Sequence, residues 1–241
     1  MTKIQRFTLI VITLFFSIEG VSSTLDTVRT NALIKKSIIP VSLIGIGIIT
    51  NNSKFEKTFQ KDLNELVGEN YENKIDDYIL VAPIILMYSA DIFGVKSKNH
   101  WFNQSKYLFI SNLISSGITK RLKKITNKTR PNGLNHAFPS GHTTISFTNP
   151  TVLYNEFIET APMLAYSGYA FATATGSFRM LNNKHWLSDV LVGAGIGILV
   201  TELVYHFEPL KRFNPFKKSD RITFIPTITN ENYGLYFTYN F

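Results

Sequence analysis

The chain has 241 residues, of which 44% are hydrophobic, 25 are Lys or Arg and 17 are Asp or Glu. This length suffices for one domain with a substantial core, and the lack of cysteine excludes a disulfide framework and a thiolate metal site. The formal net charge of +8 suits an anionic partner such as phosphate groups, an acidic membrane surface or nucleic acid, of which nucleic acid is disfavoured because the charge clusters beside one motif.

The first 23 residues are typical of a secretory signal peptide. Lys3 and Arg6 precede an apolar run over residues 7–16, and Val21-Ser22-Ser23 supplies small residues for cleavage. An uncleaved N-terminal membrane anchor is the alternative interpretation. Both interpretations predict a protein of the bacterial cell envelope, associated with the membrane.

Residues 24–210 are predicted to form an all-α bundle of about six helices. Apolar stretches cover residues 38–50, 78–95 and 107–119, and helical patterns cover residues 140–157, 162–179 and 186–205. In the polar segment 51–77, four apolar residues recur at helical spacing: Phe55, Phe59, Leu63 and Leu66. This spacing predicts an amphipathic helix that packs on a core or lies at a membrane surface.

Small residues on the last predicted helix indicate close contact between helices. Gly193, Gly195 and Gly197 stand among Val, Leu and Ile in the segment 186–205. Gly193-Ala194-Gly195 is not a nucleotide-binding loop, because it lies inside a helix instead of between a strand and a helix.

The tail, residues 211–241, has a strand-like pattern. Residues 230–234 are the turn signal, and Leu235, Phe237, Tyr239 and Phe241 alternate onto one face. We expect a short β-hairpin that covers the helical core. The alternative is an aromatic strand that binds an outer-membrane or partner surface.

The number of membrane crossings bears on the side that the site faces. Several apolar stretches are shorter than the roughly 20 residues that a crossing helix needs. If the signal is cleaved and the stretches near residues 40, 86 and 112 all cross, the loop from Lys123 to Arg130 lies in the cytoplasm. We therefore expect that not every stretch crosses and that the site faces the periplasm.

Three cations and a helix start supply what phosphate binding needs. Without a metal, the charge on a transferring phosphoryl group must be met by fixed cations or backbone N–H groups. Lys123, Arg130 and Arg179 have side chains suited to this contact. Ser140-Gly141 stands where a loop turns into a helix, whose free N–H groups and dipole bind anions.

Two histidines supply a nucleophile and a proton donor. His185 and Asp189 are four residues apart, so on a helix they share one face. An aspartate bonded to one ring nitrogen leaves the other free to attack phosphorus. His142, at the start of another helix, can protonate the leaving alcohol and then activate water.

Each cluster alone has an ordinary explanation. The basic run at residues 120–124 is typical of a solvated or headgroup-facing patch. Ser140 is typical of a helix cap, and His185 with Asp189 is typical of a surface pair. Their joint occurrence between apolar helices favours function.

The three clusters resemble the three-part signature of the type 2 phosphatidic acid phosphatase superfamily, which also includes bacterial acid phosphatases, glucose-6-phosphatase and vanadium haloperoxidases. The resemblance spans roughly residues 75–205, and His185-Trp186-Leu187-Ser188-Asp189 with the Gly/Ala-rich helix after it is especially similar. It implies a phosphatase with no metal and no cofactor that acts through a phosphohistidine. The residues that it assigns are the same: catalytic His142, His185 and Asp189, with phosphate bound by Lys123, Arg130, Ser140, Gly141 and Arg179.

The implied substrates are phosphomonoesters or diphosphates, favoured on lipids because apolar helices flank the motifs. Phosphatidic acid, phosphatidylglycerol phosphate, undecaprenyl diphosphate and lipid A phosphate all fit. In one respect the sequence departs from the family pattern: Phe178 stands where a serine usually precedes the arginine of the third motif, and Ser177 lies one place earlier. This puts one hydroxyl contact to phosphate in doubt.

Two other functions compete with a phosphatase. A vanadate-dependent haloperoxidase could use the same residues, because vanadate resembles pentavalent phosphate. An inactive envelope protein that binds lipid headgroups is the other, and the aromatic tail is its main support.

Overall fold

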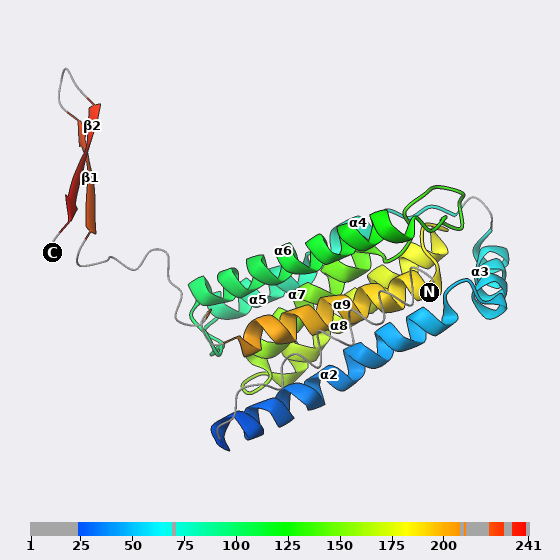
Figure 1. The fold of residues 1–241 in the computed structure, drawn as a ribbon, viewed down its shortest axis with the longest axis horizontal. Helices are drawn as coiled ribbons and strands as arrows, with labels where there is room; N and C mark the ends of the chain where they lie inside the picture. Colours follow the sequence, from blue (N-terminus) through cyan, green and yellow to red (C-terminus); the bar gives the residue numbers. More distant parts are fainter. Residues whose placement is uncertain (1–23, 69–70, 208–209, 211–221, 229–232, 240–241) are drawn as a thin grey trace. The chain divides into compact units, whose positions relative to one another are not determined.

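The computed structural model describes residues 31–68, 71–207 and 210, together with the backbone of residues 24–30, 222–228 and 233–239, so the predicted signal segment 1–23 lies outside the described residues. The chain divides into two units, one ending at His206 and one beginning at Phe207. The described part of the first unit consists of helices joined by loops and contains no strand, which confirms the all-α class (Figure 1). Its helices are α2 (Thr24–Thr50), α3 (Lys54–Val67), α4 (Asp76–Ile79), α5 (Ala82–Ile92), α6 (Trp101–Thr126), α7 (Gly141–Phe157), α8 (Pro162–Leu181) and α9 (Leu187–His206).

These described residues form eight helices where about six were predicted, because the polar segment 51–77 contains a separate helix, α3, and the stretch 78–95 is divided into two helices. α3 begins after Ser53, whose hydroxyl accepts a bond from Glu56 N at 3.1 Å, and ends at Gly68, whose φ of 89° favours glycine. The stretch 78–95 is divided between α4 and α5, and Pro83 stands in the first turn of α5, where its missing N–H costs nothing.

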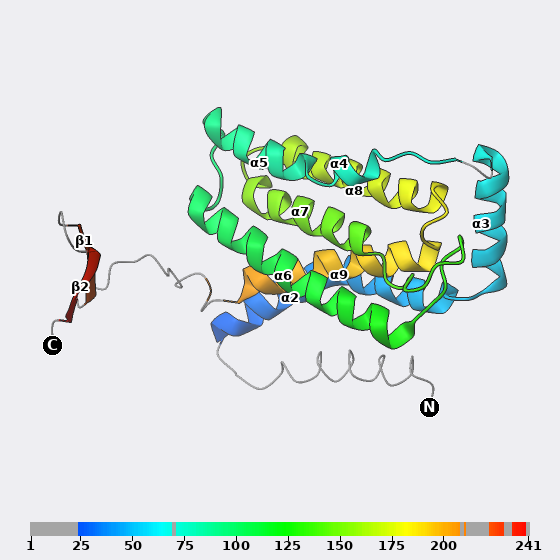
Figure 2. The same ribbon diagram turned by 90° about the horizontal axis from the view of Figure 1, so that it is seen from above.

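α3 contacts the bundle with polar side chains, while part of its apolar face is exposed. Glu56 and Gln60 are its buried residues, and Gln60 donates to Met180 O on α8 at 2.9 Å. Phe55 and Leu66 are 60% and 79% exposed. Both views place α3 across the end of the bundle at which α9 begins (Figure 2). Of the two arrangements left open by the sequence, α3 packs on the bundle, but through its polar side.

α9 is the central helix of the first unit and packs against α2, α6 and α7. Its glycines allow these contacts: a side chain at Gly193 would meet Ser140 O of the segment leading into α7 at 2.7 Å, and one at Gly195 would meet Pro40 O of α2 at 2.6 Å. The predicted close approach of this helix to its neighbours is therefore confirmed. Backbone atoms of α2 and α7 lie directly against the glycines of α9.

The apolar core and the polar end of α7 are separate. Met87 and Ala90 of α5 pack with Val152 and Phe157 near the end of α7 and with Ala165 of α8. Nearer the start of α7, its contacts with α6 are hydrogen bonds between small polar side chains. They join Ser115 to Thr148 at 3.2 Å, Thr119 to Thr144 at 3.1 Å and Asn112 to Asn149 at 2.9 Å. These bonds satisfy polar groups that burial would otherwise leave unpaired.

The second unit contains β1 (Ile222–Ile228) and β2 (Tyr233–Tyr239), which pair antiparallel with Ile225 opposite Tyr236. The predicted turn at residues 230–234 lies mostly outside the described residues. The hairpin as a whole and its surface role therefore stay predictions.

Two helical segments among the described residues are long and apolar enough to cross a membrane, Asn31–Thr50 and Leu187–His206. The second is 78% buried inside the first unit, as expected of its central helix.

Replacing Gly197 with Ala tests the packing of α9 on α7. The added methyl group would lie 2.5 Å from Thr144 O and 2.9 Å from Thr148 N, both backbone atoms that cannot move aside cheaply. We expect Gly197→Ala to lower the free energy of unfolding by about 1–3 kcal/mol. The measurement is chemical unfolding in detergent, followed by circular dichroism.

The matched control is Gly45→Ala on α2, where an added methyl group meets nothing within 4 Å. This change should be neutral or stabilise by up to about 1 kcal/mol, because Ala is the better helix former. Equal losses in the two variants would contradict this account of the α7–α9 contact.

Candidate functional site

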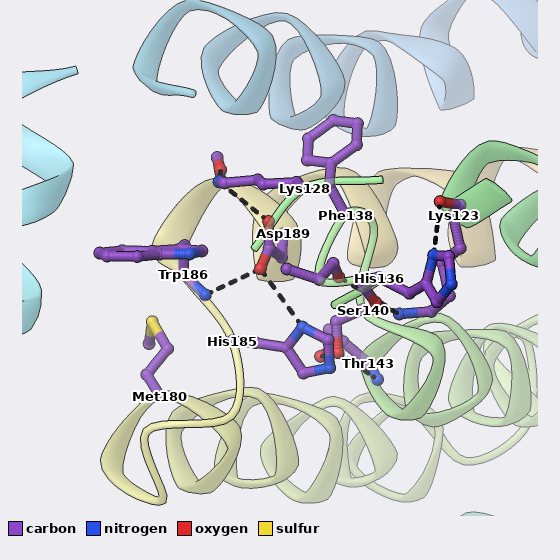
Figure 3. A network of polar contacts seen from close by, with 12 residues as sticks. Lys123, Lys128, His136, Phe138, Ser140, Thr143, Met180, His185, Trp186 and Asp189 are labelled. Carbon is purple, nitrogen blue, oxygen red and sulfur yellow. Dashed lines mark hydrogen bonds and ion pairs between the residues drawn. The ribbon is translucent and has the colours of Figure 1, made fainter. Parts of the chain in front are cut away.

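His185 and Asp189 lie in contact where α8 connects to α9. His185 Nδ1 is 3.3 Å from Asp189 Oδ2, and both side chains are almost fully buried (Figure 3). The expectation that they stand on one helix is wrong, because α9 begins at Leu187 and His185 precedes it. Trp186 N donates to Asp189 Oδ2 at 2.9 Å, so the carboxylate also caps the start of α9.

The His185 ring is held neutral. Burial lowers its pKa to about 4, against the opposing effect of the Asp189 carboxylate, and the charges of Lys123 and Arg179 lower it further. A neutral ring that donates from Nδ1 to Asp189 carries its lone pair on Nε2. Within the described residues Nε2 makes no hydrogen bond, so it is available to attack an electrophile.

A buried lysine that the sequence did not single out holds the other oxygen of Asp189. Lys128 Nζ is 3.1 Å from Asp189 Oδ1 and 3.2 Å from Glu56 Oε2. It also donates to Ser188 Oγ at 2.8 Å, and Glu56 Oε1 accepts from Ser188 N at 2.9 Å. Glu56 comes from α3, more than a hundred residues earlier in the chain, so no local spacing could have revealed this network.

The three predicted phosphate-binding cations converge. Burial lowers the pKa of Lys123 to about 8, and the charges of Arg130 and Arg179 contribute to that shift. Burial and the charge of Arg179 likewise lower the pKa of Arg130. Because side chains of like charge lower each other's pKa only when they are near one another, these shifts agree with a single cationic site.

Arg130 and Arg179 each have one N–H donor that is not used among the described residues. Arg130 Nε and Arg179 Nε are buried and have no hydrogen-bond partner among the described residues. A buried unpaired N–H is costly, and an oxyanion bound between the two guanidinium groups would satisfy both.

The start of α7 lies beside these cations. A side chain at Gly141 would meet Lys123 Cε at 3.8 Å, while Lys123 Nζ donates to the carbonyl of His136 at 2.7 Å. Ser140 is the N-cap of α7, and its buried hydroxyl accepts from Thr143 Oγ1 at 2.9 Å. The cap fixes the first turn of α7, and an anion site formed by the remaining N–H groups there stays a prediction.

Two adjacent acids on α4, which the sequence did not single out, contact the other site residues. Asp76 is fully buried and lies 2.8 Å from Arg179 NH1. Asp77 is partly exposed, and its Oδ1 lies 2.9 Å from His142 Nε2. Burial and the charge of Arg179 lower the pKa of His142, while the two acids oppose that change. Within the described residues no three His, Cys, Asp or Glu side chains are grouped to hold a metal ion.

The chain has relatives of known family. Residues 104–213, which include all eight predicted site residues, match the model of the PAP2 superfamily. A lipid A 1-phosphatase of Porphyromonas gingivalis is 33% identical over 143 residues, which are 58% of this chain and 32% of that protein. The chain therefore spans about a third of the length of that relative.

Two solved structures are similar to this one. Aquifex aeolicus LpxE is 20% identical with a TM-score of 0.50, covering 65% of this chain and 98% of that chain. The first transmembrane PAP2 type phosphatidylglycerolphosphate phosphatase from Bacillus subtilis is 17% identical with a TM-score of 0.47, covering 74% of this chain and 99% of that chain. The likeness to LpxE indicates a shared fold.

The Lys128 network yields a prediction for stability. Lys128→Met leaves the buried carboxylates of Glu56 and Asp189 without their cation, and Glu56→Gln removes one acceptor from the buried ammonium. We expect Lys128→Met to lower the free energy of unfolding by about 3–5 kcal/mol, because it leaves two buried carboxylates without their cation, and Glu56→Gln to lower it by less, because Asp189 still pairs with the ammonium. Chemical unfolding of both variants measures this.

The double variant Glu56→Gln/Lys128→Met should lower the free energy of unfolding by less than the sum of the two single variants. Both charges of the Glu56–Lys128 pair are then removed together, so neither is left buried without the other. Strict additivity would mean that these two side chains do not interact.

Proposed function

We propose that the chain, whose residues 104–213 match the model of the PAP2 superfamily, is a metal-independent phosphatase that hydrolyses phosphate esters of lipids through a phosphorylated His185. The observation that carries the proposal is a neutral imidazole with a free Nε2 beside three converging cations. The nucleophile and the charge that would stabilise the transferring phosphoryl group are thus available in one place.

In the first step, His185 Nε2 attacks phosphorus and the bond from phosphorus to the leaving oxygen breaks. Asp189 stabilises the positive charge that develops on the ring and keeps Nε2 directed outward. His142 donates a proton to the leaving alcohol. Arg130, Arg179, Lys123 and the N–H groups at the start of α7 meet the charge on the three phosphoryl oxygens.

In the second step, water hydrolyses the phosphohistidine. His142, now neutral, takes a proton from the water, the new P–O bond forms and the P–N bond breaks. Inorganic phosphate leaves, and both imidazoles return to their starting protonation states. The cycle needs no redox partner.

Lipid A carrying a 1-phosphate is the substrate class to test first. The curated relative at 33% identity is a lipid A 1-phosphatase, which supports this choice among the four lipid phosphates that the motifs allow. Residues 24–210 would form the catalytic domain, associated with the membrane and facing the periplasm after removal of residues 1–23. The apolar segment Asn31–Thr50 supports the membrane association.

The decisive experiment is phosphate release from lipid A 1-phosphate in detergent with EDTA present. We expect His185→Ala to lose at least about 10³-fold in kcat, because no other group can replace the nucleophile. Acid-labile, alkali-stable label should remain on the wild-type protein after a quench with a substrate labelled at phosphorus, and none on the variant.

His100→Gln is the control for loss of a histidine, since His100 is exposed and caps α6 at the start of that helix. It should keep wild-type activity. Full activity in His185→Ala, or halide oxidation that requires added vanadate, would contradict the proposed function.

The pKa shifts predict a bell-shaped dependence of kcat/KM on pH. His185 must be neutral, so activity falls as pH drops through about 4, the pKa to which burial lowers this ring. His142 must be protonated, and burial holds its pKa below the ordinary 6.5, so activity falls again from mildly acidic pH upward. Lys123, with its pKa lowered to about 8 mainly by burial, loses its charge at higher pH and steepens that fall.

The optimum of kcat/KM should therefore lie at mildly acidic pH, between the pKa of His185 and the pKa of His142. A pH series of kcat/KM measures it. An optimum above pH 8 would contradict the assigned roles of the two histidines.

A further inference from the structure

We propose that Asp77 selects substrates by the charge of their leaving group, so that the site prefers phosphomonoesters of neutral alcohols to diphosphates. This inference rests on the function proposed above, and it narrows the substrate class. It starts from the contact between Asp77 and His142, which phosphate chemistry does not require.

The two acids of α4 differ in how they are held. Asp76 is fully buried between Arg179 NH1 at 2.8 Å and Asn182 Nδ2 at 3.2 Å, so its charge is compensated inside the fold. Asp77 has a 45% exposed side chain, lies 2.9 Å from His142 Nε2 and is 3.8 Å from Arg179 NH1. Among the described residues, the Asp77 carboxylate therefore has one partner within hydrogen-bond distance, and it remains partly open to water.

The position of Asp77 corresponds to the side from which the leaving group departs. In an in-line displacement, the attacking and leaving atoms lie on opposite sides of phosphorus. If His185 attacks, the leaving oxygen faces the proton donor His142, and Asp77 is bonded to that same imidazole. Asp77 is bonded to Nε2 of His142, so a leaving oxygen that takes its proton from Nε2 replaces that bond and carries its attached group beside the Asp77 carboxylate.

The effect of this carboxylate depends on what leaves. When an alcohol leaves, the leaving group carries no charge for Asp77 to repel, and the bond of Asp77 to His142 favours the protonated ring that the first step needs. When the substrate is a diphosphate, the leaving group is itself a phosphate whose negative charge adjoins the bond that breaks. That charge would face Asp77 at close range, and like charges at such a distance repel.

The lipid phosphates therefore separate into two groups. Undecaprenyl diphosphate places a second phosphate directly on the leaving side. In phosphatidic acid and lipid A 1-phosphate, the leaving oxygen is bonded to a carbon atom, and that part of the leaving group carries no charge. We expect the wild-type protein to favour this second group.

The experiment compares kcat/KM for lipid A 1-phosphate and undecaprenyl diphosphate in the same detergent with EDTA, for wild type, Asp77→Asn and Glu159→Gln. In Asp77→Asn the preference for the monophosphate should fall about tenfold, the scale expected when one partly solvated charge is removed. Glu159→Gln is the matched control, because it also removes one acidic charge. Its side chain is 74% exposed and comes just after the last residue of α7, whereas the site lies at the first residues of that helix. It should leave the preference unchanged.

An unchanged preference in Asp77→Asn would overturn the inference, as would an equal loss toward both substrates, which would assign to Asp77 only the orientation of His142. If Asp77→Asn does not fold, Asp77→Ser takes its place in the same comparison. Failure of the proposed function has a separate sign, namely no phosphate release by wild type from either lipid.

Binding provides a readout that does not depend on turnover. Calorimetry with His185→Ala measures the affinity for orthophosphate and for pyrophosphate. Adding Asp77→Asn should improve pyrophosphate binding about tenfold relative to orthophosphate. Equal changes for the two anions would again overturn the role of Asp77.

Discussion

The structure depends on holding several positive charges close together at one end of a helical bundle. The charges of Arg130 and Arg179 lower the pKa of Lys123, and the charge of Arg179 lowers the pKa of Arg130, so the fold must offset repulsion among these cations. It does so with two buried acids. Asp76 pairs with Arg179, and the charge of Asp189 opposes the lowering of the pKa of Lys123 and Arg130. Within the part of the chain that the structure describes, the Nε atoms of Arg130 and Arg179 have no hydrogen-bond partner, so both N–H groups remain available to a phosphate oxygen.

The helical bundle provides this arrangement by bringing helix ends together. The site uses the end of α6, the start of α7, the end of α8 and the segment that leads into α9, all at the end of the bundle beside α3 (Figure 1). This requires α7 and α9 to pack closely, and Gly193 and Gly197 allow backbone distances there that any side chain would prevent. Helix ends also leave N–H groups unpaired, so the packing that aligns them produces an anion site from backbone atoms.

Much of this could be predicted from the sequence, and the reasons differ by residue. Helix boundaries from α7 to α9 follow from apolar runs, a capping serine and Pro162, all of which act locally. The contact between His185 and Asp189 was predicted from spacing, although α9 begins only after His185. Glu56, Asp76 and Lys128 were missed because their partners are 60 or more residues away in the chain, and a lone acid or lysine carries no signature.

Two kinds of carboxylate can then be distinguished by burial. A fully buried acid such as Asp76 or Asp189 must have a partner in every state of the protein, because an uncompensated charge inside the fold is too costly. Such an acid can orient a catalytic group but cannot respond to a substrate. Asp77 is half exposed, so water can stabilise its charge when the bond to His142 is lost. A carboxylate of this second kind can stay charged while a substrate approaches, and its field then acts on whatever the substrate carries.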